Sequence, residues 1–423
     1  MLREYILLLS LFSSAVCIMG HPGGGYPYSD NMTLAASELY NTIAAEKGGK
    51  GGSNFVFSPF SILSVFKMAQ MGARGATRAE MDQHLSFAAS LDLPALGGAR
   101  APWESEPAIQ LETANRMYVE SSLAKDSQFI HFAREVLKHL KSEAVTQDFQ
   151  DSKAAADTIN AFVEEKTKGH IKELVPASLL SPETRMVLIN ALYFKGPWAF
   201  PFLPDLTTFG SFCVEDGDAG CAKEQQVKFM QQRLERGFGY FEGETVKVLS
   251  LPYADWRFSL YVFLPQNISQ FEEQLLQRPE IIEELVRQVD RTGSSGSVLD
   301  LSMPLIKLSP EQNRVDLVEV YKSLGVRLMF EADKADFSGI SRDRQLFVSS
   351  FLHQADFMWN EEGTEAAAAT AMLVAETAAF LPKRELSLAI DRPFLFQVRV
   401  KDTANSHSLV LLSGRITDAR AAQ

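Results

Sequence analysis

The sequence predicts an α+β fold in one large domain. Apolar residues recur at helical spacing through its first part, whereas apolar runs typical of strands dominate from about Met186 onward. No internal repeat and no linker-like stretch divides residues 31–420. Helices followed mainly by strands, without a break between them, indicate a single α+β unit.

The N-terminus predicts a signal peptide over residues 1–20. Arg3 precedes the apolar run from Ile6 to Val16, and small or mildly polar residues continue to Gly20. This run is too short to cross a bilayer, so a cleaved secretory signal is favoured over an uncleaved membrane anchor. We therefore expect a secreted protein, exported to the outside or to a secretory organelle.

Helices are expected in the first part of the mature chain. Residues 21–30 are rich in Gly, Pro and Tyr and predict a disordered leader, and residues 88–107, broken by Gly and Pro, predict a loop. Apolar periodicity predicts helices over residues 33–46, 60–72, 77–86, 127–142 and 153–167.

Strands are expected in the second part. The segments are rich in β-branched and aromatic residues. They cover residues 187–194, 246–252, 258–264, 298–303, 346–351, 394–400 and 409–413.

Composition excludes some classes of partner. The 423 residues are 46% hydrophobic and 22% charged, as in an ordinary globular protein with a sizeable core. The net charge of −12 and the lack of a dense Lys/Arg cluster argue against nucleic acid. No segment after the N-terminus is long and apolar enough to span a membrane.

Two cysteines and two sequons are candidate modification sites. Loss of the signal removes Cys17 and leaves Cys213 and Cys221, which flank a short acidic loop. They predict a local disulfide in an oxidising compartment and free thiols in a reducing one. Asn31 and Asn267 begin sequons and would accept glycans after export.

Catalytic and metal-binding patterns are not found in the sequence. None of the seven histidines pairs with another at His-x-x-x-His spacing, and there is no Gly-x-Ser-x-Gly elbow or phosphate-binding glycine loop. The acidic pairs Glu164-Glu165 and Glu272-Glu273 predict solvated helix faces, and His353 predicts a hydrogen-bonded core histidine. We expect no enzyme activity, no cofactor and no metal.

Residues 361–380 are ambiguous between loop, helix and strand. Their alanines favour a helix, which Thr364 is able to cap. With a period of two, one face carries only small or apolar side chains, while Glu365 lies on the other face. That face consists of Thr364, Ala366, Ala368, Thr370, Met372 and Val374.

Several separated motifs carry a resemblance to a known family. They are the segments 54–61 (NFVFSPFS), 158–167 (TINAFVEEKT), 188–198 (LINALYFKGPW), 336–340 (DFSGI), 392–396 (RPFLF) and 413–416 (SGRI). In this order the chain resembles the serpins over residues 30–418. The resemblance implies three β-sheets, about nine α-helices and an exposed reactive-centre loop in a metastable fold.

The resemblance also implies roles for particular residues. The polar cluster under the opening of the main sheet, called the shutter, comprises Asn54, Ser58, Ser61, Asn190 and His353. The hinge, at the start of the reactive-centre loop of about residues 361–390, comprises Glu361, Glu362, Gly363, Thr364, Glu365, Ala366, Ala367, Ala368, Ala369 and Thr370. The small inward-facing residues of this hinge are those of inhibitory serpins.

The implied activity is suicide inhibition of a serine protease by a monomeric serpin. The protease cleaves the loop, and the freed segment inserts into the main sheet before the acyl-enzyme is hydrolysed. A non-inhibitory serpin, such as a carrier or chaperone, and a cross-class inhibitor of papain-like cysteine proteases remain alternatives.

The scissile bond is predicted by counting from the hinge. Inhibitory serpins place it fourteen residues after the hinge glycine, which gives Thr377-Ala378 and an elastase-like target. The loop is longer than usual, so Phe380 or Leu381, for a chymotrypsin-like protease, and Lys383 or Arg384, for a trypsin-like one, remain open. Elastase-like and chymotrypsin-like targets are favoured.

Two departures from the family pattern bear on regulation. The region 88–107 holds a single basic residue, Arg100, so activation by heparin through that site is not expected. Asp356 and Trp359 stand where the family usually has apolar branched residues, in the strand that leads to the hinge. Asp356 is expected to alter how tightly the sheet is held shut.

Overall fold

The computed structural model describes most of the 423-residue chain. The described residues are 27–49, 51–84, 109–217, 220–293, 296–308, 313–342, 345–364, 383–402 and 407–420. The predicted signal peptide and the predicted loop at 88–107 lie outside them, as do the scissile-bond candidates from Thr377 to Leu381.

Eight α-helices are present in the described part of the chain. They are α2 (Pro27–Glu46), α3 (Pro59–Gly72), α4 (Gly75–His84), α7 (Ser127–Leu140), α8 (Ser152–Lys166), α9 (Ile268–Gln277), α10 (Ile281–Thr292) and α12 (Leu317–Ser323). Aspartate caps begin three of them: Asp126 accepts the amides of Gln128 and Phe129, Asp151 those of Lys153 and Ala154, and Asp316 that of Val318.

One boundary of the predicted leader is wrong. Helix α2 begins at Pro27, so residues 27–30 of the predicted disordered leader are helical. Proline is favoured in the first turn of a helix because its missing N–H is not needed there. The glycine and proline content of residues 21–30 had suggested a later start.

The main sheet receives the hinge. Its strands run in the order β12 (Arg314–Asp316), β13 (Val348–Asp356), β4 (Met186–Pro197), β2 (Gln110–Glu120) and β3 (Glu143–Gln147). Strands β13 and β4 pair in parallel, whereas β4 and β2 are antiparallel. The short strand β15 (Gly363–Thr364) adds to the end of β4.

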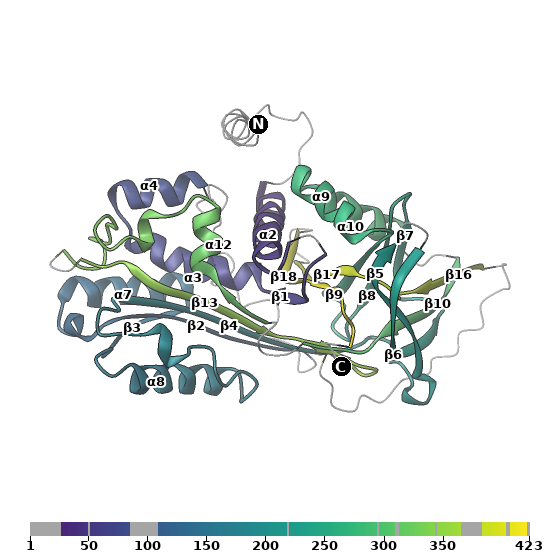
Figure 1. Ribbon diagram of the computed structural model, residues 1–423, viewed down its shortest axis with the longest axis horizontal. Coiled ribbons are helices and arrows are strands. Elements are labelled where there is room, and N and C mark those ends of the chain that lie inside the picture. The colour runs from purple at the N-terminus through teal and green to yellow at the C-terminus, as the bar shows by residue number, and fades with distance from the viewer. Residues whose placement is uncertain are drawn as a thin grey trace.

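Two further sheets lie towards the other end of the molecule (Figure 1). The first is β1 (Phe55–Phe57), β18 (His407–Ile416), β17 (Phe394–Asp402), β9 (Phe258–Pro265), β8 (Val246–Pro252) and β7 (Gly239–Glu242). The second is β16 (Arg384–Ala389), β10 (Ser297–Pro304), β6 (Gly220–Leu234) and β5 (Thr208–Gly217). A two-stranded ladder pairs β11 (Ile306–Lys307) with β14 (Met358–Trp359).

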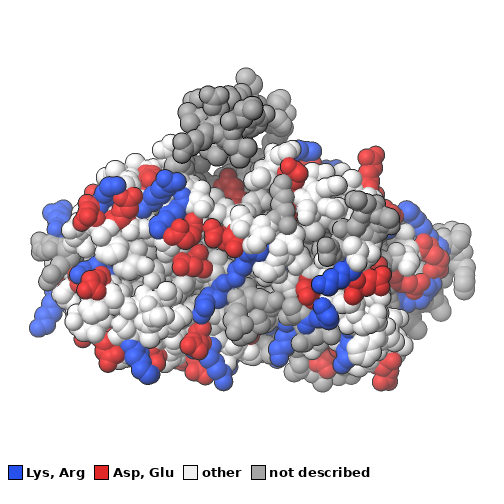
Figure 2. All heavy atoms as spheres, viewed as in Figure 1, with Lys and Arg blue, Asp and Glu red and all other residues white. Residues whose placement is uncertain are grey.

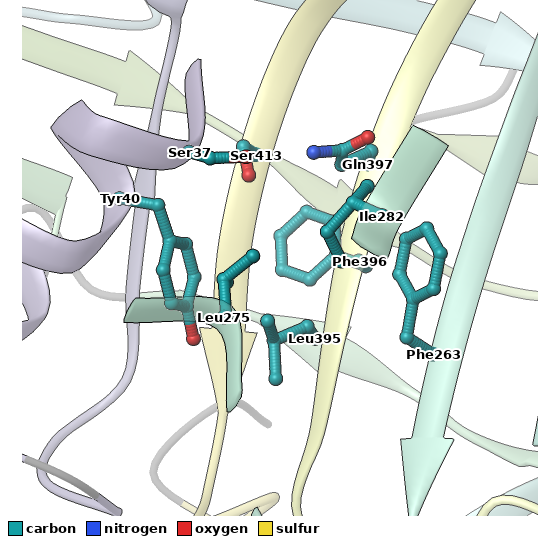
Figure 3. Close-up of a pocket in the computed structure, with 9 residues that line it drawn as sticks. All are labelled: Ser37, Tyr40, Phe263, Leu275, Ile282, Leu395, Phe396, Gln397 and Ser413. Atoms are coloured by element: carbon teal, nitrogen blue, oxygen red, sulfur yellow. The ribbon is translucent and has the colours of Figure 1, made fainter. Parts of the chain in front are cut away.

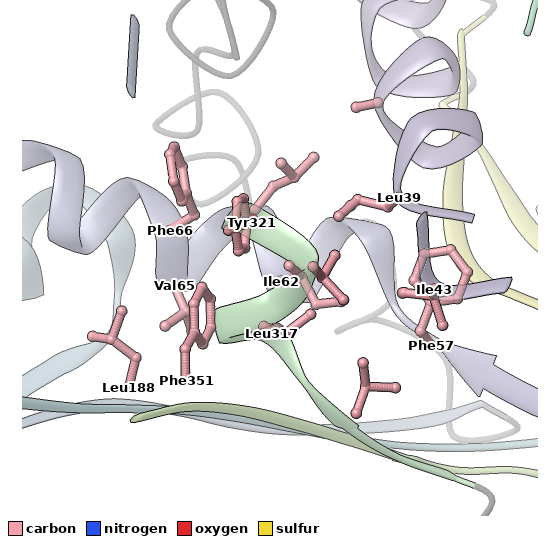
Figure 4. Close-up of a cluster of buried hydrophobic side chains, with 14 of the residues drawn as sticks. Leu39, Ile43, Phe57, Ile62, Val65, Phe66, Leu188, Leu317, Tyr321 and Phe351 are labelled. Atoms are coloured by element: carbon pink, nitrogen blue, oxygen red, sulfur yellow. The ribbon is translucent and has the colours of Figure 1, made fainter. Parts of the chain in front are cut away.

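Helices cover both faces of the main sheet (Figure 1). Helix α8 lies on one face, where its Ile159 and Val163 pack in a cluster with Ile189 and Ala191 of β4. Helix α3 lies on the opposite face. Its Val65 and Phe66 share a cluster with Tyr321 of α12, and Figure 4 shows how these side chains meet above the sheet. Every β4 residue from Met186 to Phe194 is buried, which explains why the strand is apolar apart from Asn190 and the Tyr193 hydroxyl.

The prediction that Glu272 and Glu273 form a solvated helix face is correct for Glu273 and wrong for Glu272. Glu273 is exposed, but Glu272 is buried against Arg415 of β18, with 2.7 Å between Glu272 Oε1 and Arg415 Nη1. The same carboxylate accepts hydrogen bonds from the Tyr40 hydroxyl at 2.7 Å and the Gly51 amide at 2.8 Å. Glu164 and Glu165 are both exposed, as expected. A buried partner far along the chain is not visible in local sequence.

The surface is mixed in charge. Figure 2 shows acidic and basic side chains interleaved over the displayed face. Within the described helices, none is both long and apolar enough to cross a membrane.

Candidate functional site: the hinge and the seam of the main sheet

The first residues of the hinge are held at the end of β4. The Glu361 carbonyl accepts the Phe202 amide at 2.7 Å, and the Glu362 carbonyl accepts the Trp198 amide at 2.9 Å. The Trp198 indole N–H is donated to the Asn360 carbonyl at 2.9 Å. These bonds fix the direction in which the chain leaves the end of the sheet.

Gly363 is required by the close approach of two backbones. It has a φ of 154°, and a Cβ at this position would lie 2.3 Å from the Gly196 carbonyl oxygen. Any other residue would push the chain away from β4. The glycine therefore lets β15 form against Gly196 and Pro197.

Thr364 faces the core. It is fully buried, and its hydroxyl lies 2.8 Å from the hydroxyl of Tyr253. Tyr253 in turn stacks on Trp198, with ring centroids 4.8 Å apart. The small polar side chain of Thr364 thus fills a buried position beside these aromatic rings, where a larger side chain has no room.

The seam is the junction between β4 and β13. These strands pair directly, from Val348 opposite Met186 to Asp356 opposite Tyr193. A new strand is able to enter the main sheet next to β15 only if this ladder opens. The main sheet is therefore closed, and β15 forms the beginning of a further strand at one end.

Four of the five predicted shutter residues meet beneath the seam. The imidazole Nε2 of His353 accepts the Ser58 amide at 3.0 Å, and its Nδ1 bonds Asn190 Oδ1. The Asn190 amide is donated to the Ser61 hydroxyl and to Asn115 Oδ1. Since Asn190 lies on β4 and His353 on β13, their bond ties the two sides of the seam.

Asn54 is not part of this network. Its Oδ1 accepts the amides of Thr417 at 2.7 Å and Asp418 at 3.0 Å, and its amide is donated to the Asp418 carbonyl at 2.7 Å. It ties the chain before β1 to the end of β18. Asn115 takes its place in the cluster and was missed, because strand β2 was not expected from the sequence.

Burial lowers the pKa of His353 to about 3. The ring is therefore neutral at physiological pH, with Nε2 as acceptor and Nδ1–H as donor. The unfolded state, with an ordinary histidine pKa near 6.5, binds a proton more readily. The contribution of neutral His353 to the free energy of unfolding is therefore complete above about pH 6.5. It is lost progressively as the pH falls towards 3.

We expect His353 to steepen the acid dependence of stability. Between about pH 6 and pH 4 the free energy of unfolding of the unchanged protein should fall by up to roughly 1.4 kcal/mol per pH unit more than that of a His353→Asn variant. Denaturant unfolding of both proteins across this range measures the difference. Because carboxylates titrate in both proteins, the comparison isolates the histidine. Parallel profiles would show that His353 does not contribute.

The remaining predicted loop residues divide at residue 382. Glu361 to Thr364 lie at the end of β4, whereas Glu365 to Thr370 of the hinge lie outside the described residues. Lys383 is exposed and pairs with Glu235, with 2.8 Å between Lys383 Nζ and Glu235 Oε2. Arg384 begins β16, and its amide is donated to the Gly296 carbonyl at 2.8 Å.

The cysteines and sequons lie away from the hinge. Cys213 and Cys221 are joined by a disulfide in the β5–β6 hairpin. Asn267 caps α9 by accepting the Gln270 amide at 2.9 Å. Asn31 lies within α2.

Two hollows in the described part of the chain lie away from the hinge. A small hollow lies between α2, α9, α10 and strands β9, β17 and β18 (Figure 3), and no histidine, cysteine or carboxylate lines it. A wider, open cleft borders α3 and α7, and its polar lining consists of Arg74, Arg78, His131, Glu135 and His139. The described residues include no group of three His, Cys, Asp or Glu side chains placed to hold a metal.

The closed main sheet, with Gly363 and Thr364 buried at the end of β4, defines the class of protein. The family model of serpins, described as serine protease inhibitors, matches residues 30–419. The chain belongs to the serpin family. The predicted α+β serpin fold is confirmed.

Known relatives agree over nearly the whole chain. The leukocyte elastase inhibitor A of Mus musculus is 32% identical over 394 residues, covering 92% of this chain and 98% of its own. Serpin48 of Tenebrio molitor, described as highly specific, is 27% identical with a TM-score of 0.74 and covers 94% of this chain and 100% of its own. Human thyroxine-binding globulin, solved with its hormone, is 25% identical with a TM-score of 0.75, covering 93% of this chain and 99% of its own.

The prediction of secretion is wrong. The matching curated relatives include several leukocyte elastase inhibitors, which are intracellular serpins without a signal peptide. A short apolar run after an arginine was the basis of the prediction, and hydrophobicity alone does not distinguish an export signal from other apolar segments. The expected glycans at Asn31 and Asn267 depended on export and lose their premise with it.

Proposed function

We propose that this serpin is a suicide-substrate inhibitor of an elastase-like serine protease. The observation that carries the proposal is the hinge: β15 already pairs with β4, and its inward residue Thr364 is small and buried. Insertion of the cleaved loop would continue this pairing along β4. The family match and the elastase-inhibiting relatives support the same activity.

The register of β15 specifies how the loop would insert. Gly363 lies opposite Pro197 and Thr364 opposite Gly196 in an antiparallel ladder. Continued one residue at a time, this register places Ala366 opposite Phe194, Ala368 opposite Leu192 and Thr370 opposite Asn190. These residues would face the core with Thr364, and their small size suits that face.

The free energy of insertion would come from new contacts on both sides of the strand. About a dozen additional ladder hydrogen bonds would each contribute roughly 0.5–1.5 kcal/mol. Thr370 would arrive level with Asn190 and His353, which are register partners across the seam. The Asn190–His353 bond must therefore separate before the entering strand continues towards Met186 and Val348.

The scissile bond is proposed at Thr377-Ala378. Its small residues suit the shallow pocket of an elastase-like protease, and elastase inhibitors are among the relatives. The alternatives Lys383 and Arg384 are disfavoured because Arg384 is hydrogen-bonded into β16 and Lys383 directly precedes it. Phe380 and Leu381 remain candidates for a chymotrypsin-like target.

The hinge argues against the alternative of a carrier. Thyroxine-binding globulin shares the fold, so the fold alone does not distinguish inhibitors from carriers. A strand with bulky or charged inward residues would pay a large desolvation cost on insertion, whereas Thr364 and the alanines after it would not. Cross-class inhibition of papain-like proteases is the second alternative, which a panel of proteases tests.

The proposal predicts a covalent complex and a stability gain on cleavage. Incubation with a pancreatic or neutrophil elastase should give an SDS-stable band at the summed mass of the two proteins less that of the released C-terminal peptide. Mass spectrometry of this peptide should identify Ala378 as its first residue. Chymotrypsin, trypsin and a papain-like protease serve as comparisons. Protein cut in the loop by a non-target protease should melt at least about 20 °C higher than intact protein, because the inserted strand adds contacts that intact protein lacks.

Either of two results would contradict the proposal. Complete cleavage by every protease without a stable complex would favour a non-inhibitory serpin. An unchanged melting temperature after cleavage would show that the loop does not insert.

A further inference from the structure

One rung of the main sheet carries three polar side chains in a row. Glu112 of β2 lies opposite Tyr193 of β4, and Tyr193 lies opposite Asp356 of β13. Residues at one register level project from the same face of a sheet. That face is the one covered by α8. Tyr193 is two residues from Ala191 on the strand and so lies on the same face, and Ala191 packs in the α8 cluster.

The chain that follows α8 crosses this rung. Lys168 forms an ion pair with Glu112. The ring of His170 stacks on Tyr193, with centroids 3.7 Å apart and planes 8° from parallel. His170 Nδ1 also lies 3.9 Å from Asp356 Oδ2. Residues 168–170 thus contact β2, β4 and β13 within three residues of sequence.

The crossing segment is anchored to α8. The buried Thr167 hydroxyl is donated to the Val163 carbonyl at 2.7 Å and accepts the Ile171 amide at 3.1 Å. The Gly169 amide is donated to the Glu164 carbonyl at 2.8 Å. Lys168 takes the left-handed conformation, with φ of 53°, so the turn places its side chain and that of His170 over the sheet.

We infer that residues 168–170 form a latch that holds the seam closed and whose hold through His170 varies with pH. The inference rests on the proposed function, because the seam is where the loop would insert. The Asp356–Tyr193 rung is the end of the β4–β13 ladder that lies towards β15. When β4 and β13 separate, His170 must leave either Tyr193 or Asp356.

The pH dependence follows from the charges around His170. Asp356 is the carboxylate within reach of the ring, while Glu112 is paired with Lys168. Tyr193 offers an uncharged face, and Lys195 lies two residues further along the same face of β4. Lys172 and Glu173 are exposed on the latch's own segment.

A protonated imidazole forms an ion pair with a neighbouring carboxylate, and histidine is the side chain whose charge changes between pH 5 and pH 8. The latch should therefore hold the seam more tightly near pH 6 than near pH 8.

Native-state hydrogen exchange tests the latch without a protease. In a His170→Ala variant the amides of β4 and β13 near Tyr193 and Asp356 should open roughly 3- to 10-fold more often than in the unchanged protein, after correction for intrinsic exchange, with the larger effect at pH 6. Amides of β10 and β16 should be unaffected. His131→Ala, on the exposed face of α7, is the matched histidine control and should leave the seam unchanged.

Two further variants separate stacking from charge. His170→Phe keeps an aromatic ring over Tyr193 and should hold the seam equally at both pH values. Asp356→Asn should also remove the pH dependence, and adding His170→Phe to it should bring little further change, because both substitutions break the same ion pair.

The outcomes bear separately on the latch and on inhibition. Equal seam opening in the unchanged protein and the His170→Ala variant would overturn the latch, even if covalent complexes form normally. If seam opening still depends on pH in the His170→Phe variant, the charge of His170 is not the cause of that dependence. If His170→Ala loosens the seam but the unchanged protein traps no protease, the latch stands and the proposed inhibition fails.

Discussion

Replacing Thr364 by arginine is expected to convert an inhibitor into a substrate. The Thr364 side chain is fully buried and hydrogen-bonded to Tyr253, so an arginine there would have to be buried without a partner. Burying an unpaired charge costs several kcal/mol, which insertion of the strand would have to offset. We expect the yield of SDS-stable complex with elastase to fall at least about tenfold, while cleavage of the loop continues.

Glu365→Arg is the matched control for this experiment. It adds the same side chain one residue later, where strand alternation places it on the opposite face, towards solvent. Its complex yield should remain close to that of the unchanged protein. A Thr364→Arg variant that traps elastase as well as this control would show that the inward face of the hinge does not govern inhibition.

Replacing Glu272 by alanine is expected to cause the largest loss of stability. Both the Glu272 carboxylate and the Arg415 guanidinium are buried, and the carboxylate also accepts the Tyr40 hydroxyl and the Gly51 amide. Removal of Glu272 leaves the arginine charge buried without its counterion. Breaking such a pair from one side costs about 3–5 kcal/mol. Denaturant unfolding at pH 7 measures this loss.

The neighbouring glutamate provides the control. Glu273→Ala changes the same chemical group at the next position of α9, but this side chain is exposed. Its removal should cost less than about 1 kcal/mol. Similar losses for the two variants would mean that the Glu272–Arg415 pair is not a net source of stability.

The fold was largely predictable because the strands of its second part are long and apolar. Residues 187–194 and 258–264 were expected as strands, and the structure contains β4 and β9 there. Predominantly apolar runs of that kind arise where both faces of a sheet are covered. Strand β2 was missed because it mixes exposed and buried residues without clear alternation.

The site was only partly predictable, since its contacts join residues distant in sequence. Ser58, Ser61, Asn190 and His353 were assigned by resemblance, and the structure brings them together. Asn115 and the latch at residues 168–170 carry no local signal. Each acquires its role only from the strand register that sets it beside its partners.

The sequence by itself determined the α+β class, the family resemblance and the small inward face of the hinge. These are properties of side-chain size, periodicity and ordered motifs, which the chain carries before it folds. Only the tertiary structure decided that Glu272 is buried, that Asn54 lies outside the shutter and that His170 bridges the seam. Those outcomes depend on long-range packing, because burial and pairing are set by segments that meet only in the folded protein.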